Sequence, residues 1–130
     1  MVFKRLVLLS IVSVNAGYTL FLFPVLGLLY PSRVPLTLSN LLAFVTTNTL
    51  WGILLAVVVY LVVRLTGVSL PRAITWSILM LWISFWLIPL LAGIDKLPLG
   101  LDDAVVVCID GGAAILSMMV MLKLVKRYIL

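Results

Sequence analysis

Long runs of hydrophobic residues, separated by short polar stretches, fill almost the whole chain. There are four such runs, at residues 6–29, 41–63, 73–92 and 101–122. Each is close to the length of about 20 residues that a helix needs to cross a bilayer. The connections at 30–40, 64–72 and 93–100 are rich in turn-forming residues. The pattern predicts an all-α integral membrane protein with four transmembrane helices, in which residues 1–130 form a single transmembrane domain.

The composition supports the same class of protein. Hydrophobic residues make up 65% of the chain and charged residues only 10%, whereas a soluble domain keeps about 25% of its residues charged. So few charges cannot cover a surface that faces water, so membrane lipids are the expected surroundings. The runs and connections account for nearly every residue, which leaves no stretch for a separate soluble domain.

The positions of the cations predict the orientation. Seven of the nine lie before the first run, around the second connection, or after the last run: Lys4, Arg5, Arg64, Arg72, Lys123, Lys126 and Arg127. Only Arg33 and Lys96 lie on the other side. The positive-inside rule therefore predicts a multi-pass protein of the plasma (cytoplasmic) membrane with both termini in the cytoplasm. The cations are spread over the ends of the runs, so no nucleic-acid surface is predicted.

Polar residues also predict where three of the helices begin. Ser39 or Asn40 is expected to cap the second helix, and Ser69 the third. Asp102 or Asp103 is expected to cap the fourth, where a carboxylate meets the positive end of the helix dipole.

The two halves of the chain, 1–65 and 66–130, resemble each other. Residues 33–40 align with 96–103 at an offset of 63, and this offset places Thr47 on Asp110. With a loop two residues shorter, Pro24 meets Pro89. We therefore predict two tandem helical hairpins related as parallel repeats, with matched kinks at the two prolines. Parallel repeats occur in transporters and also where a small helical unit is doubled to bury more surface, so the repeat alone does not identify a function.

Asp110 is the one carboxylate well inside an apolar run, with no cation within a helical turn. An ionisable group in lipid is costly and marks a functional or assembly site. When protonated, Asp110 can donate a hydrogen bond to Asn48, Asn15 or a backbone carbonyl. When ionised, it needs water or a cation, so a neutral acid is the simpler resting state. We rank helix or partner contact ahead of ion coupling for this residue.

Other candidate contact residues lie on faces defined by helical spacing. Thr47, Asn48 and Asn15 can join Asp110 in a helix contact or in an ion or solute site. Small residues let helices approach closely, and this group comprises Gly52, Ala56, Ala114 and Ser117. Trp82 and Trp86 form a bulky stripe, which we interpret as a surface for packing against lipid or a partner.

The residue inventory argues against an enzyme. The chain has no histidine, no glutamate, no phosphate-binding glycine loop and no serine elbow. A lone buried aspartate does not make a catalytic constellation. No metal and no cofactor are expected, and the one cysteine, Cys108, rules out an internal disulfide and is interpreted as a small packing residue.

The doubled-hairpin layout, with Leu41-Leu42-Ala43-Phe44 opening the second run, resembles the small four-span GtrA-like proteins associated with translocation of lipid-linked sugars. The chain lacks the Asn-and-Arg signature that ends their second span. No site residue is therefore taken from that family, and the chain is not assigned to it.

Two functional hypotheses follow. The first is a non-catalytic membrane protein, an integral accessory subunit of a larger membrane complex or a homo-oligomer, whose partners are other membrane subunits or copies of itself. The alternative is a small oligomeric transporter, channel or flippase for a lipid-linked substrate, with Asp110 as the intramembrane coupling or selectivity group.

Overall fold

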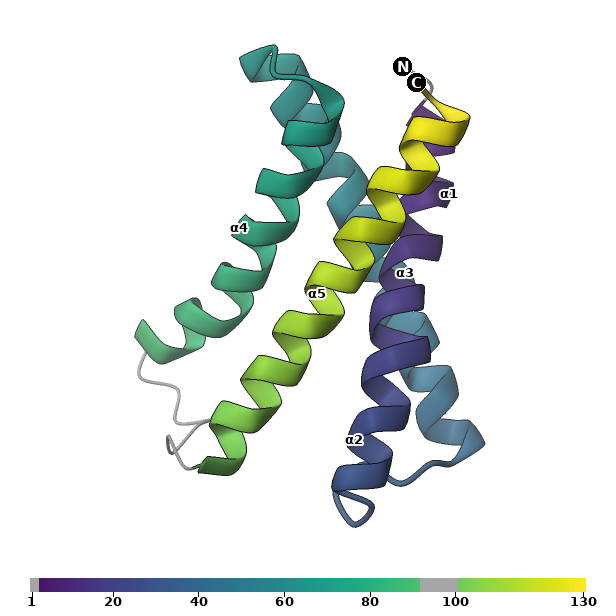
Figure 1. Ribbon diagram of the computed structural model, residues 1–130, viewed down its shortest axis with the longest axis vertical. Coiled ribbons are helices and arrows are strands. Elements are labelled where there is room, and N and C mark those ends of the chain that lie inside the picture. Colours follow the sequence, from purple (N-terminus) through teal and green to yellow (C-terminus); the bar gives the residue numbers. More distant parts are fainter. Residues whose placement is uncertain (1–2, 92–100) are drawn as a thin grey trace.

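The computed structural model describes residues 3–91 and 101–130, and within these ranges the chain forms helices and no strand (Figure 1). Four helical segments are long and apolar enough to cross a membrane: Phe3–Leu29, Leu38–Thr66, Leu70–Ile88 and Val105–Tyr128. The prediction of an all-helical, multi-pass membrane protein is confirmed at this level. The spans match the four apolar runs. An apolar run in lipid forms a helix along its length, because a helix satisfies its backbone hydrogen bonds internally.

The first span changes its hydrogen-bonding pattern near the middle. α1 (Phe3–Val14) continues into the π-helix η1 (Asn15–Leu22) and then α2 (Phe23–Leu29). The N–H of Phe23 donates to the carbonyl of Tyr18, five residues earlier. Pro24 follows at the start of α2. In a regular α-helix its ring would collide with the carbonyl four residues before it, and a wider turn relieves that contact. The π-helical stretch ends just before Pro24. The kinks expected at Pro24 and Pro89 stay predictions, and the side chain of Pro89 lies outside the described residues.

The second span, α3 (Leu38–Thr66), begins earlier than predicted. Thr37 is its N-cap, and the Thr37 side chain accepts a hydrogen bond of 3.2 Å from the N–H of Asn40. The predicted caps, Ser39 and Asn40, are therefore wrong, because both lie in the first turn of the helix. Asn40 instead uses its side-chain amide to donate to the carbonyl of Pro35 at 2.8 Å. At the other end Gly67 takes the left-handed conformation, with φ of 70°.

The last two spans are α4 (Leu70–Leu91) and α5 (Leu101–Tyr128). Ser69 stands directly before α4, as predicted, and its carbonyl accepts a hydrogen bond of 3.0 Å from the N–H of Ala73. Asp102 and Asp103 follow the first residue of α5, Leu101, so the prediction that one of them is the cap is wrong for the same reason as for Ser39 and Asn40. The side chains of the two aspartates lie outside the described residues.

The first span packs between its neighbours, with α1 and η1 each in contact with both α3 and α5. α4 packs against α3 and α5. Every described residue of α4 that is buried falls between Leu70 and Ile78. The helix is thus held by its N-terminal half, and its other half diverges from α2 (Figure 1). This divergence leaves space inside the bundle.

Small residues allow the closest helix contacts. A Cβ atom added to Gly52 of α3 would lie 2.7 Å from the Cα atom of Ile11, so the backbones of α3 and α1 nearly touch. Gly17 of η1 makes a similar approach to α5, against the Ser117 side chain and the carbonyl of Ala113. Such contacts are typical of helices that associate in lipid, where close packing replaces the hydrophobic effect.

The two ends of the bundle differ in charge. Both termini lie at one end, together with the α3–α4 connection (Figure 1). The side chain of Arg5 donates to the carbonyl of Tyr128 at 3.5 Å, which joins the first and last helices there. Lys4, Arg64 and Arg72 belong to the same end, because they stand next to the helix termini that meet there.

The predicted internal repeat stays a prediction. The stretch of α4 that aligns with η1, at residues 80–87, is α-helical, so the two halves differ in backbone at this point. Thr47 and Asp110, which the repeat aligns, nevertheless line one cavity.

Candidate functional site

The bundle contains a cavity of about 450 Å³, which we call the Asp110 cavity. It lies where α4 diverges, and side chains from the first span, α3, α4 and α5 all line it. Most of the described lining is apolar. Six aromatic residues contribute: Tyr18, Phe44, Trp51, Trp82, Phe85 and Trp86. The volume falls in the range of about 300–1,000 Å³ that is usual for small-molecule sites.

Asp110 is the charged residue among the described lining side chains. It is 5% exposed, and its Oδ2 atom accepts a hydrogen bond of 2.7 Å from the indole nitrogen of Trp86. The other oxygen, Oδ1, is buried and has no hydrogen-bond partner among the described residues. The indole nitrogen of Trp82, on the same helix as Trp86, is also buried without a partner. Buried polar groups without partners are rare, so an acceptor and a donor remain available at one site.

Asp110 reaches this position because of the face it occupies on α5. Ala113, Ala114, Ser117 and Met121 follow it at helical spacing, and all four are buried. This face packs against the first span, where Gly17 meets Ser117. The contact fixes the rotation of α5 and so turns Asp110 into the bundle.

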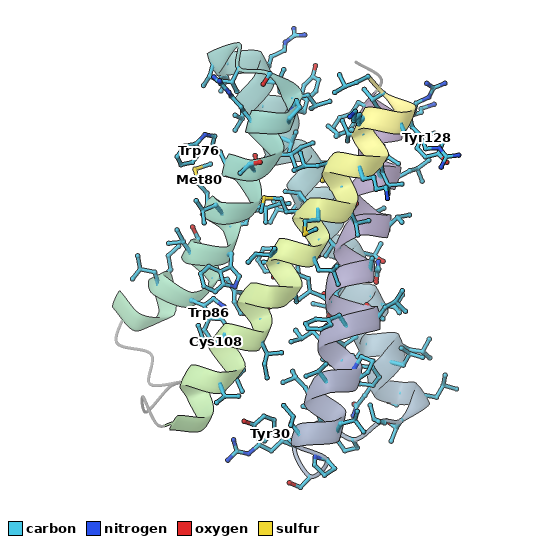
Figure 2. The ribbon with its side chains drawn as sticks, viewed as in Figure 1. Tyr30, Trp76, Met80, Trp86, Cys108 and Tyr128 are labelled. Atoms are coloured by element: carbon cyan, nitrogen blue, oxygen red, sulfur yellow. The ribbon has the colours of Figure 1, made fainter. Side chains whose placement is uncertain are left out.

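Three aromatic rings connect α3 to the carboxylate. Trp51 and Phe85 meet edge to face with centroids 5.8 Å apart, and Phe85 and Trp86 do so at 5.4 Å. Edge-to-face pairs are a preferred aromatic geometry. The pairs hold the Trp86 indole in place, so the hydrogen bond to Asp110 has a fixed direction. Figure 2 shows Trp86 on the side of α4 that faces α5, with Trp76 and Met80 on the opposite side.

A second polar group links the first span to α3. The side-chain amide of Asn48 donates to the Thr19 hydroxyl at 2.9 Å, and Thr19 donates to Oδ1 of Asn15 at 2.8 Å. The Asn15 amide donates in turn to the carbonyl of Ile11 at 3.0 Å and to the Thr49 hydroxyl at 3.4 Å. Asn48 is thus held at the cavity wall by partners behind it.

The structure divides the predicted site residues into two groups. Thr47 and Asn48 line the Asp110 cavity together with Asp110. Asn15 does not line it, but accepts a hydrogen bond from Thr19, which in turn accepts one from Asn48. The proposed hydrogen bond from Asp110 to Asn48 or Asn15 is wrong. Among the described residues, Oδ1 of Asp110 has no hydrogen-bond partner, and Oδ2 accepts from Trp86 of α4.

The remaining predicted residues lie inside the single bundle. Gly52, Ala56 and Ala114 are buried, and Ser117 both lines the cavity and contacts Gly17. Trp82 and Trp86, interpreted from the sequence as a lipid or partner surface, line the cavity instead. Cys108 is exposed, so its interpretation as a packing residue is wrong for this chain by itself.

Sequence reasoning missed several lining residues. Phe44, Trp51 and Leu55 share one face of α3 with Asn48, because the four residues recur every three or four positions. This spacing was readable from the sequence. Tyr18 was also missed, and its position in the cavity wall depends on how η1 packs against α5.

The described residues contain no group of three or more His, Cys, Asp or Glu side chains that could hold a metal ion. The chemistry available from the described lining is that of one carboxylate, three indole N–H groups, hydroxyls and an amide in apolar surroundings. This combination suits binding and proton exchange. No protein-family model, curated protein or solved structure matches the chain.

Proposed function

We propose that this protein is a small membrane carrier whose solute site is the Asp110 cavity. The observation that carries the proposal is the Oδ1 atom of Asp110, which is buried in the cavity wall without a hydrogen-bond partner. Placing a carboxylate in apolar surroundings costs several kcal/mol unless it is paired. A packing contact alone does not require a titratable group there, whereas binding a solute or a proton does.

The shape and lining of the cavity support a carrier for a small amphiphilic solute. All four spans contribute walls, and sites between the helices of a bundle are common in ligand-binding proteins. The divergent half of α4 borders the site, and the described residues of α4 that are buried lie near its other end. In this proposal a movement of α4 changes access, and Asp110 exchanges a bound proton for the solute.

The proposed orientation follows the charges. The cation-rich end of the bundle carries both termini, and we place it in the cytoplasm of a cell bounded by the plasma membrane. The carrier can work as a homo-oligomer, since a second copy or lipid can close the cavity beside α4.

The proposal is tested in proteoliposomes that contain a pH-sensitive dye. Pools of cationic, neutral and anionic amphiphiles are applied, and the change in internal pH is compared with that of protein-free liposomes, because exchange of a proton for a solute moves protons even where it moves no net charge. We expect at least one pool to give a larger pH change with the wild-type protein, and Asp110→Asn to remove the difference. The Asn side chain keeps the size and hydrogen bonding of Asp but cannot exchange a proton. Equal responses from wild-type and protein-free liposomes for every pool would contradict the proposal.

A second candidate is a non-catalytic subunit of a larger membrane complex. It is favoured by the outer face of α4, where Trp76 is 58% exposed and Met80 47%, with Ile83 and Leu87 exposed in line with them (Figure 2). It is weakened because the small-residue faces and Trp82 and Trp86 are used inside one bundle. Mass measurement of the particle extracted gently from its membrane separates the two: fixed amounts of other proteins support the subunit, and the chain alone or with its own copies supports the carrier.

A further inference from the structure

We infer that the solute of the Asp110 cavity is a protonated organic amine with an apolar body. The inference rests on the proposed function, because it names the chemical class of the solute for that same site. It follows from three separate properties of the described lining: its charge, its unpaired hydrogen-bond acceptor and its aromatic rings.

The charge of the lining selects a cation. Asp110 is a carboxylate, and no lysine or arginine occurs among the described side chains around the cavity. An anionic solute would therefore lack a counter-charge and would be repelled by the ionised carboxylate. In apolar surroundings such an interaction is weakened little by water or salt.

The unpaired oxygen selects a solute that can donate a hydrogen bond. Oδ2 of Asp110 accepts a hydrogen bond of 2.7 Å from Trp86, and Oδ1 is buried with no partner in the part of the chain that the structure describes. An ammonium N–H can donate a charge-assisted hydrogen bond to Oδ1, and such a bond is roughly twice as strong as one between neutral groups. A quaternary ammonium ion has no N–H, so it would leave Oδ1 unpaired.

The aromatic rings select a cation with an organic body. Six aromatic residues line the cavity, and the faces of such rings are electronegative and attract cations. The volume of about 450 Å³ is much larger than an inorganic ion needs. The described residues also hold no cluster of metal-binding side chains. An amine attached to an apolar group fills the space and pairs with the carboxylate.

The inference is tested by equilibrium dialysis with four radiolabelled probes that share a naphthyl group. They are 2-naphthylethylamine, its N,N,N-trimethyl derivative, 2-naphthylethanol and 2-naphthylacetate. The protein is held in lipid nanodiscs, and empty nanodiscs correct for partition into lipid. We expect the protonated amine to bind at least about tenfold more tightly than the alcohol, from the usual strength of a hydrogen bond to a charged group. The quaternary derivative should fall between them, and the anion should bind most weakly.

Variants locate the effect. Asp110→Asn should bring the amine to the affinity of the alcohol, and Trp76→Phe, on the outer face of α4, should leave all four affinities unchanged. Lowering the pH should weaken amine binding in the wild-type protein as Asp110 takes up a proton. Tyr18 is the other titratable side chain among the described lining residues, so Tyr18→Phe should keep this pH dependence.

Each outcome decides the inference. The alcohol or the anion binding as tightly as the amine would overturn it while leaving the carrier proposal in place. Amine affinity that is unchanged in Asp110→Asn would do the same. No binding of any probe above the empty discs would overturn both. The comparison of the four probes uses the wild-type protein alone, so it stands even where a variant fails to fold.

Discussion

The indole nitrogen of Trp86 on α4 donates a hydrogen bond of 2.7 Å to the Asp110 carboxylate on α5. This bond joins two helices near the point where α4 has no buried residue of its own. It therefore does two things. It ties the divergent half of α4 to the bundle, and it leaves one carboxylate oxygen facing the cavity.

Replacing Trp86 by Phe should weaken this attachment. The substitution keeps an aromatic ring but removes the donor, so we expect the free energy of unfolding in detergent micelles to fall by about 1–2 kcal/mol. Trp76→Phe is the matched control on the same helix, because Trp76 is 58% exposed. It should change stability by less than about 0.5 kcal/mol. Equal effects of the two substitutions would argue against a structural role for the bond.

Two glycines should respond in opposite ways to alanine. In Gly52→Ala the new methyl group meets the backbone of Ile11, which cannot move aside, so we expect a loss of about 1–3 kcal/mol. In Gly112→Ala the nearest atom is a ring carbon of Phe21 at 3.8 Å, an ordinary contact. Alanine is the better helix former, so this variant should be neutral or more stable by up to about 1 kcal/mol. Thermal unfolding measures both, and a stabilising Gly52→Ala would contradict the close contact of α1 with α3.

The polar chain behind Asn48 should depend on Thr19. Thr19→Val keeps the shape but leaves the Asn48 amide and Oδ1 of Asn15 without the hydroxyl that joins them. We expect a loss of about 1–3 kcal/mol, the usual cost of an unsatisfied buried polar group. Thr46→Val is the control, since Thr46 is exposed and bonds only the carbonyl of Leu42 in its own helix. Unfolding in a chemical denaturant compares the two variants. A Thr19→Val variant as stable as the wild-type protein would show that the hydrogen bonds joining Asn48, Thr19 and Asn15 contribute little to stability.

The start of α3 provides a test of the cap. Thr37→Ala removes the oxygen that accepts from the N–H of Asn40, so it should destabilise the protein by about 1 kcal/mol. Ser39→Ala, two residues further on, should have little effect because that residue is inside the first turn and exposed. Thermal unfolding of the two variants distinguishes the caps. If Ser39→Ala were the more damaging, the helix would begin where the sequence pattern suggested.

The number and extent of the spans follow from the amino-acid pattern. Apolar runs of membrane-spanning length leave few alternatives, because every backbone polar group in lipid must be bonded within its own helix. It also singled out Asp110, since a carboxylate inside such a run is costly wherever the helix is placed. The π-helical stretch before Pro24 was not predicted, because nothing in the local pattern separates it from an α-helix.

The partner of Asp110 follows from how the helices pack. The candidate partners chosen from the sequence were two amides and a backbone carbonyl, whereas the partner is the indole of Trp86, which had been interpreted as part of a lipid or partner surface. The helices here are apolar on almost every side, so periodicity does not fix how each one is rotated about its axis. That rotation is set by a few close contacts, such as Gly17 against Ser117 and Gly52 against Ile11. Those contacts orient α5 and α3 within the bundle, and α4, which packs against both, brings Trp82 and Trp86 to the cavity that Asp110 lines.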